Sequence, residues 1–192
     1  MRKVKIEPIF YIFIAMAFML IPARLVIGWL IAVTVHELFH FLALILCNVE
    51  INNIIISTTG VKMEIGDLHG FREAICALAG PLGGLSLVLL RRWLPCAAIL
   101  GSIHSCINLL PIFYLDGGRA LHCILNLLFG IHTSDYVHLI ISYAVTILLA
   151  LSVAYYFLQS NFVVGSFWVA CILFTNKTMR KFPCKPIKQI VQ

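Results

Sequence analysis

Long apolar stretches follow one another along this chain, with only short polar interruptions between them. A helix needs about 20 apolar residues to cross a bilayer. The stretches that approach or exceed this length are residues 8–21, 25–47, 73–90, 95–115, 136–158 and 162–175, and a shorter apolar piece, 120–129, follows the fourth. The pattern predicts an all-α polytopic membrane protein of about six transmembrane helices.

The composition agrees with a membrane protein. Of the 192 residues, 61% are hydrophobic and 11% are charged, and the mean hydropathy is +1.01. A soluble domain has about a quarter of its residues charged. We therefore expect one membrane domain over residues 1–176 and a short basic tail over 177–192. Most of the 7 cysteines fall inside apolar runs without metal-ligand spacing, which is typical of small apolar side chains within helices.

The basic residues are distributed unevenly between the two sides of the predicted spans. Six spans place both termini on one side. If that side is the cytoplasm, the outer loops carry only Arg24, Arg91 and Arg92 of the 14 basic residues. Such a bias is the orientation signal of membrane proteins. It predicts cytoplasmic termini in a cell membrane, and it explains the net charge of +6 without nucleic acid as a partner.

One predicted inner loop differs from the others. Residues 49–70 contain β-branched runs, a Thr-Thr-Gly break and the alternating stretch VKMEI. Strand propensity on both sides of a turn favours a small β-hairpin at the membrane surface over an unstructured connector.

The second apolar stretch contains three ionisable residues close together: His36, Glu37 and His40. Residues four apart share one face of a helix, so both imidazoles can bind one zinc ion, and Glu37 can act as a general base. Ionisable residues inside a span cost about 2.5–3.5 kcal/mol each on insertion scales. A buried histidine is commonly a hydrogen-bonded core residue, but three polar side chains on one turn favour a site with a divalent cation.

A catalytic zinc ion takes three protein ligands and keeps one position open. Asp67 and Asp135 lie in predicted loops, whereas Asp116 lies at the inner end of the fourth stretch, just before two glycines. The second and fourth stretches run in the same direction through the membrane. We therefore expect Asp116 and the two histidines to meet in the cytoplasmic third of the bilayer, although an Asp-Gly-Gly sequence is also a common turn.

Three further features near the site have two interpretations each. Asn108 can stabilise an oxyanion or form an interhelical hydrogen bond. His104, one helical turn earlier, can support the site or simply pack. The stretch 76–84, rich in glycine and alanine, favours close helix packing over a re-entrant turn.

These motifs together resemble the site-2 protease family of intramembrane zinc metalloproteases. The resemblance rests on HELFH at 36–40, AGPLGG at 79–84 and NLLPIFYLDGGR at 108–119, in that order. The layout, with one span before the HELFH helix, is most similar to the sporulation-protease subgroup of bacteria. The chain departs from the family pattern at Phe113 and Tyr114, where a proline is common.

The resemblance implies that His36, His40 and Asp116 bind one zinc ion and that Glu37 is the catalytic base. It implies cleavage of a membrane-tethered protein, such as a pro-sigma or anti-sigma factor, within or beside its span. A regulatory membrane protein is a further expected partner. The 49–70 hairpin would capture an unwound substrate segment as an added strand.

Two other functions use the same residues. A metal transporter would pass zinc through the histidines and the aspartate, independently of Glu37. A non-catalytic membrane scaffold would bind clients through the hairpin and would not need bound metal.

Overall fold

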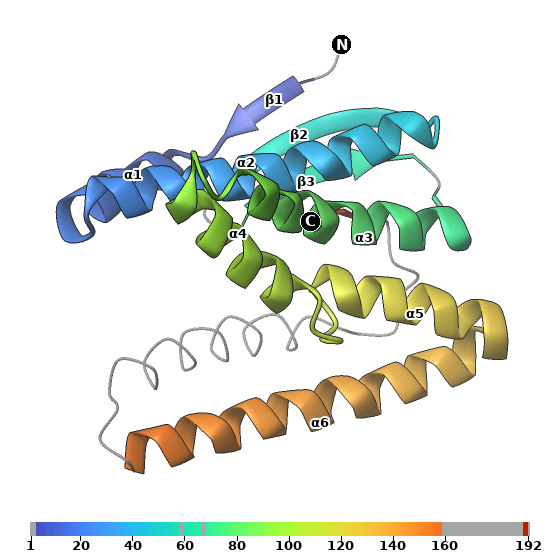
Figure 1. The fold of residues 1–192 in the computed structure, drawn as a ribbon. Coiled ribbons are helices and arrows are strands. Elements are labelled where there is room, and N and C mark those ends of the chain that lie inside the picture. Colours follow the sequence, from blue (N-terminus) through green and yellow to red (C-terminus); the bar gives the residue numbers. More distant parts are fainter. Residues whose placement is uncertain (1–2, 58–59, 67, 159–189, 192) are drawn as a thin grey trace.

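The computed structural model describes residues 3–57, 60–66, 68–158 and 190–191. Within these residues the fold is mostly helical, with one small sheet (Figure 1). The helices are α1 (Pro8–Leu20), α2 (Ala23–Leu46), α3 (Phe71–Ser86), the 3-10 helix η1 (Leu87–Leu90), α4 (Pro95–Asn108), α5 (Asp116–Phe129) and α6 (Ile131–Leu158). The strands are β1 (Lys3–Ile6), β2 (Ile51–Ser57), β3 (Gly60–Ile65) and β4 (Ile190–Val191).

In the part of the chain that the structure describes, three helical segments are long and apolar enough to cross a membrane: Ala23–Leu46, Phe71–Leu90 and Ile131–Tyr155. The shorter helix α1 is apolar too, and none of its residues is buried in the protein. Lipid is the natural surrounding for such a helix. The protein is thus a candidate multi-pass membrane protein, while the count of about six spans stays a prediction. The predicted stretch 162–175 lies outside the described residues.

The predicted fourth stretch, residues 95–115, is not one helix. Helix α4 ends at Asn108, a loop follows, and α5 begins at Asp116. Proline disfavours helical geometry in the residue before it and has no N–H to donate, so Pro111 explains why the helix does not continue. With 14 residues, α4 is about 21 Å long at 1.5 Å per residue, shorter than a bilayer core.

The hairpin predicted for residues 49–70 is present as β2 and β3, within a sheet of order β1-β2-β3-β4. Strands β2 and β3 are antiparallel, with Ile54 opposite Met63. Strand β1 adds in parallel to the outer side of β2. Strand β4 adds antiparallel to β3, with Val191 opposite Met63. The sheet therefore gathers segments from both ends of the chain around the predicted hairpin.

Helix α2 lies at the centre of the molecule. It packs against α3 and α4, while α5 packs on α3 and α6 packs on α5. The sheet runs along one side of this helical layer, and α5 and α6 lie on the opposite side (Figure 1). An apolar core joins the end of α2, the hairpin and α3 through the buried residues Ala43, Leu44, Ile51, Met63, Leu68 and Cys76. This core fixes the hairpin beside the second half of α2, where the HELFH motif lies.

Candidate metal centre

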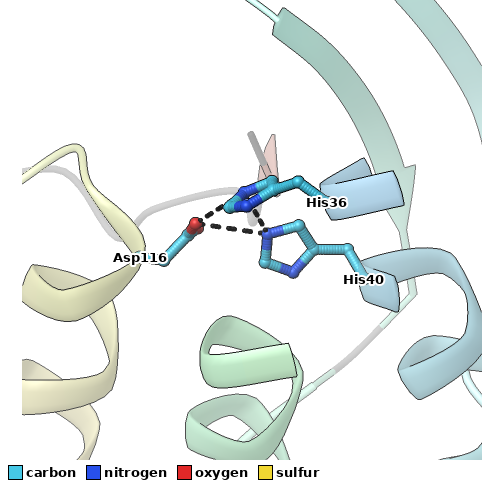
Figure 2. Close-up of side chains that lie close together, drawn as sticks. All are labelled: His36, His40 and Asp116. Atoms are coloured by element: carbon cyan, nitrogen blue, oxygen red, sulfur yellow. Dashed lines mark hydrogen bonds and ion pairs between the residues drawn. The ribbon is translucent and has the colours of Figure 1, made fainter. Parts of the chain in front are cut away.

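Three side chains predicted to bind metal meet in the interior of the protein. His36 and His40 project from one face of α2, and Asp116 is the first residue of α5 (Figure 2). All three are buried, with 3%, 1% and 5% of their surfaces exposed. The Oδ2 atom of Asp116 lies 3.1 Å from Nε2 of His36 and 3.2 Å from Nε2 of His40, and the two Nε2 atoms are 3.2 Å apart. One atom from each side chain thus points to a common centre.

Asp116 reaches this centre in a way that the sequence did not predict. It begins α5, whereas the sequence suggested a turn at the inner end of a long fourth span. The two glycines that follow it lie in the first turn of α5. A Cβ atom on Gly117 would collide with the backbone of Leu109, and one on Gly118 with the backbone of Ile112. Glycine here allows α5 to begin against the preceding loop, so that Asp116 is aimed at α2.

Helix α3 supports His40 from the other side. The Nδ1–H group of His40 donates a hydrogen bond of 2.7 Å to the backbone carbonyl of Cys76. The imidazole also lies against Gly80, where a Cβ atom would be only 2.6 Å from the ring carbons Cδ2 and Cε1. Helix α3 is continuous over Phe71–Ser86, so the expectation of close packing is confirmed and a re-entrant turn is not present here. Neither the Cys76 carbonyl nor the role of Gly80 was predicted individually.

The hydrogen bond to Cys76 determines which nitrogen of His40 is available to a metal ion. Because Nδ1 of His40 carries the proton that is donated, Nε2 of a neutral ring carries a lone pair. That lone pair faces the carboxylate of Asp116 and the second imidazole. Two imidazole nitrogens and a carboxylate oxygen, all groups that can bind a metal ion, therefore converge in a buried space.

The donor set fits zinc. Two imidazoles and one carboxylate are ligands of catalytic zinc, which binds them at about 2.0–2.2 Å with tetrahedral angles. Such bonds place ligand atoms about 3.3 Å apart, close to the 3.1–3.2 Å seen here. A hydrogen bond from the second ring nitrogen to a carbonyl is also usual for a metal-binding histidine. Within the described chain, His36, His40 and Asp116 are the group of ligand residues that can hold a metal ion.

Glu37 lies between the centre and the sheet. Its Oε1 atom accepts a hydrogen bond of 3.4 Å from the backbone N–H of Val61, at the beginning of β3. Its Oε2 atom is buried and has no hydrogen-bond partner. A buried carboxylate with an unsatisfied oxygen is costly. It is suited to accept a proton from a water molecule or a substrate.

Asn108 and His104 form a connected pair on α4. The Nδ2 atom of Asn108 is 3.0 Å from Nε2 of His104. The ring of His104 packs edge-on against His36, with ring centroids 4.7 Å apart and an angle of 77° between the planes. Both residues are therefore connected to the metal centre.

Another ring cluster lies between α5 and α6. Its members are His122, which bonds Asp135 at 2.7 Å, and His138, which stacks on Phe113 with ring centroids 4.6 Å apart. Neither histidine is part of the His-His-Asp group.

Comparisons with known proteins identify the fold. No protein-family model matches the chain, and no curated protein sequence matches it. Among solved structures, the chain is similar to the site-2 protease from Methanocaldococcus jannaschii, with a TM-score of 0.65 and 22% sequence identity. The match covers 96% of this chain and 94% of that one. At this identity the similarity shows that the two chains share a fold over nearly their whole length.

Proposed function

We propose that the protein is an intramembrane zinc metalloendopeptidase that cleaves membrane-tethered proteins. The observation that carries the proposal is the buried His-His-Asp centre with Glu37 beside it, on a fold shared with a site-2 protease. His36, His40 and Asp116 would hold the ion. Bound zinc would supply a Lewis acid that polarises a peptide carbonyl and lowers the pKa of water.

Glu37 is the proton carrier in this proposal. Its Oε2 atom has no partner in the structure and is free to take a proton from the attacking water. The same carboxylate then gives the proton to the amide nitrogen that leaves. The bond from Val61 holds Oε1 at 3.4 Å and so orients the carboxylate without using its second oxygen.

The edge of β3 supports the proposal that the substrate binds in extended form. A transmembrane helix hides its backbone and must unwind before a peptide bond can be attacked. The residues Gly60 and Val61, at the beginning of β3, lie next to Glu37. The antiparallel pairing of β4 with Met63 and Glu64 shows that this strand can accept a neighbour. An unwound segment lying along this end of β3 would pass beside the carboxylate, while the N–H of Val61 stays bonded to Glu37.

Several details of the proposal rest on the resemblance of the motifs alone. These are the pro-sigma or anti-sigma type of substrate, a function in sporulation, a regulatory membrane protein as partner, and an active site in the cytoplasmic third of the bilayer. The M. jannaschii protein supports the protease fold and does not bear on these details.

The test compares the wild-type protein with Glu37→Gln and His40→Ala. Glu37→Gln keeps the size of the side chain and removes the base, so the variant should retain bound zinc and lose cleavage. His40→Ala should lose both. Membrane-tethered proteins that accumulate in cells carrying Glu37→Gln are candidate substrates, to be cleaved afterwards by purified wild-type protein in detergent.

Two results would contradict the proposal. Wild-type protein purified without bound metal would remove its chemical basis. Equal cleavage by Glu37→Gln and wild type would show that Glu37 is not the base. Zinc flux into vesicles that survives Glu37→Gln would support the transporter instead.

A further inference from the structure

His104 is a polar residue beside the metal centre to which the proposed chemistry gives no task. It lies on α4, four residues before Asn108, so both side chains leave the same face of the helix. The two are joined by the hydrogen bond of 3.0 Å between Nδ2 of Asn108 and Nε2 of His104. An amide nitrogen can only donate, so Nε2 of His104 accepts and the ring proton lies on Nδ1.

The same ring contacts a metal-binding residue on a different helix. Its centroid is 4.7 Å from that of His36, in an edge-to-face arrangement. His104 therefore lies between His36 and Asn108 in a chain of contacts. The ring of His104 contacts His36 and accepts a hydrogen bond from Asn108. It therefore holds the amide of Asn108 at a fixed position relative to the metal centre.

The packing of α4 keeps this arrangement rigid. Gly101 of α4 lies close to the backbone of Gly84 in α3, where a Cβ atom would be 3.0 Å from the carbonyl oxygen. On the α2 side, Gly28 lies against Cys96 and Ala97 at the beginning of α4. Close contacts of this kind on two neighbouring helices leave α4 little freedom to slide or rotate.

We propose that His104 is a positioning residue that holds the amide of Asn108 for the substrate carbonyl. One N–H of the amide is occupied by His104, and the other remains to donate to the oxygen on which negative charge develops. A donor held in place before the reaction stabilises that charge without reorganising, which is why its orientation matters. This inference rests on the proposed protease function and assigns Asn108 the catalytic contact and His104 the indirect one.

Three substitutions separate the hydrogen bond from the ring packing. His104→Phe keeps a flat ring against His36 and removes the acceptor. His104→Gln keeps an acceptor at a similar reach. Asn108→Ala removes the donor itself. Cys106→Ala, at an exposed position of the same helix, is the matched control. Each variant is measured for kcat, KM, zinc per protein and thermal unfolding, with a tethered substrate found by the Glu37→Gln comparison.

We expect His104→Phe and Asn108→Ala to lower kcat by about 100-fold each, the usual effect of losing one oxyanion donor. KM and zinc content should stay at wild-type values. The double variant should be no worse than Asn108→Ala alone, because the two residues act as one unit. The kcat of His104→Gln should be at least about tenfold higher than that of His104→Phe. Cys106→Ala should have the kcat of the wild type.

Other outcomes would overturn the inference. If His104→Phe loses zinc in proportion to activity, His104 supports the ion rather than Asn108. If the losses multiply in the double variant, or if kcat is unchanged, the two residues do not work together. The proposed function fails separately, when wild-type protein does not cleave any tethered substrate or does so without Glu37.

Discussion

Substitution of Gly80 by alanine tests whether the structure describes the support of His40 correctly. In a helix interior with free space, this change stabilises a protein by about 0.5–1 kcal/mol. Here the new Cβ atom would lie 2.6 Å from two ring carbons of His40 and closer still to Nε2. Since ordinary contacts begin near 3.4 Å, the ring must move by about 0.8 Å or more.

Metal binding should suffer more than folding. Overpacking of this kind lowers the free energy of unfolding by about 1–3 kcal/mol. The higher helix propensity of alanine offsets part of this loss. Metal–ligand distances tolerate only about 0.2 Å of error, and the displaced atom is the ligand nitrogen itself. We expect zinc affinity to fall by at least about 100-fold, equal to about 3 kcal/mol of binding free energy.

Gly83→Ala is the matched control. It lies in the same helix, and its Cβ atom would lie 2.7 Å from Cβ and Cδ2 of Phe39 and closer still to Cγ. Phe39 binds no metal. Both variants are purified in detergent, depleted of zinc with a chelator and titrated with zinc against a competing indicator, with thermal unfolding measured in parallel. Both should unfold at somewhat lower temperature, but only Gly80→Ala should lose zinc. Equal zinc loss in both, or wild-type affinity in Gly80→Ala, would refute the reasoning.

Other contacts give further predictions. The guanidinium of Arg119 pairs with Glu73 at 3.8 Å and has a second buried nitrogen without a partner. Glu73→Gln should therefore lower the unfolding free energy by about 1 kcal/mol, and an unchanged melting temperature would contradict the pairing. Gly117→Ala should reduce zinc content more than Gly80→Ala, because its Cβ atom meets rigid backbone instead of a side chain; equal zinc content would contradict this. The sulfurs of Cys47 and Cys76 are 3.7 Å apart, so diamide should join them in folded protein, and mass spectrometry of the peptides should detect the disulfide.

The sequence predicted which residues form the centre better than it predicted the helices and loops that carry them. The spacing of His36 and His40 determines their common face on a helix, and the scarcity of aspartate left Asp116 as the best third ligand. The loop after Asn108 was missed because apolar residues continue through it to residue 115. Hydropathy does not distinguish a long helix from a helix followed by an apolar loop. Pro111 indicated that the helix weakens before Asp116, but not that it ends at Asn108.

The contacts that hold the centre together were less predictable. Glycine at position 80 indicates close packing, but the sequence does not show which side chain fills the space. The sequence did not show whether His104 forms a hydrogen bond or only packs, because residues four apart on a helix can do either. The hairpin was predicted from strand propensity, whereas β1 and β4 pair with it across long distances in sequence, which local patterns cannot reveal.

The preformed triangle of two nitrogens and one oxygen has a consequence for metal selectivity. Donors of this kind bind divalent metals in the order Mn²⁺ < Fe²⁺ < Co²⁺ < Ni²⁺ < Cu²⁺ > Zn²⁺. The ligand atoms already lie 3.1–3.2 Å apart, and their affinity alone does not favour zinc over copper. An ion bound at this centre would therefore reflect the metal supply of the cell or of the growth medium. Activity should therefore be compared per bound zinc, after exchange into defined metal, rather than per molecule of protein.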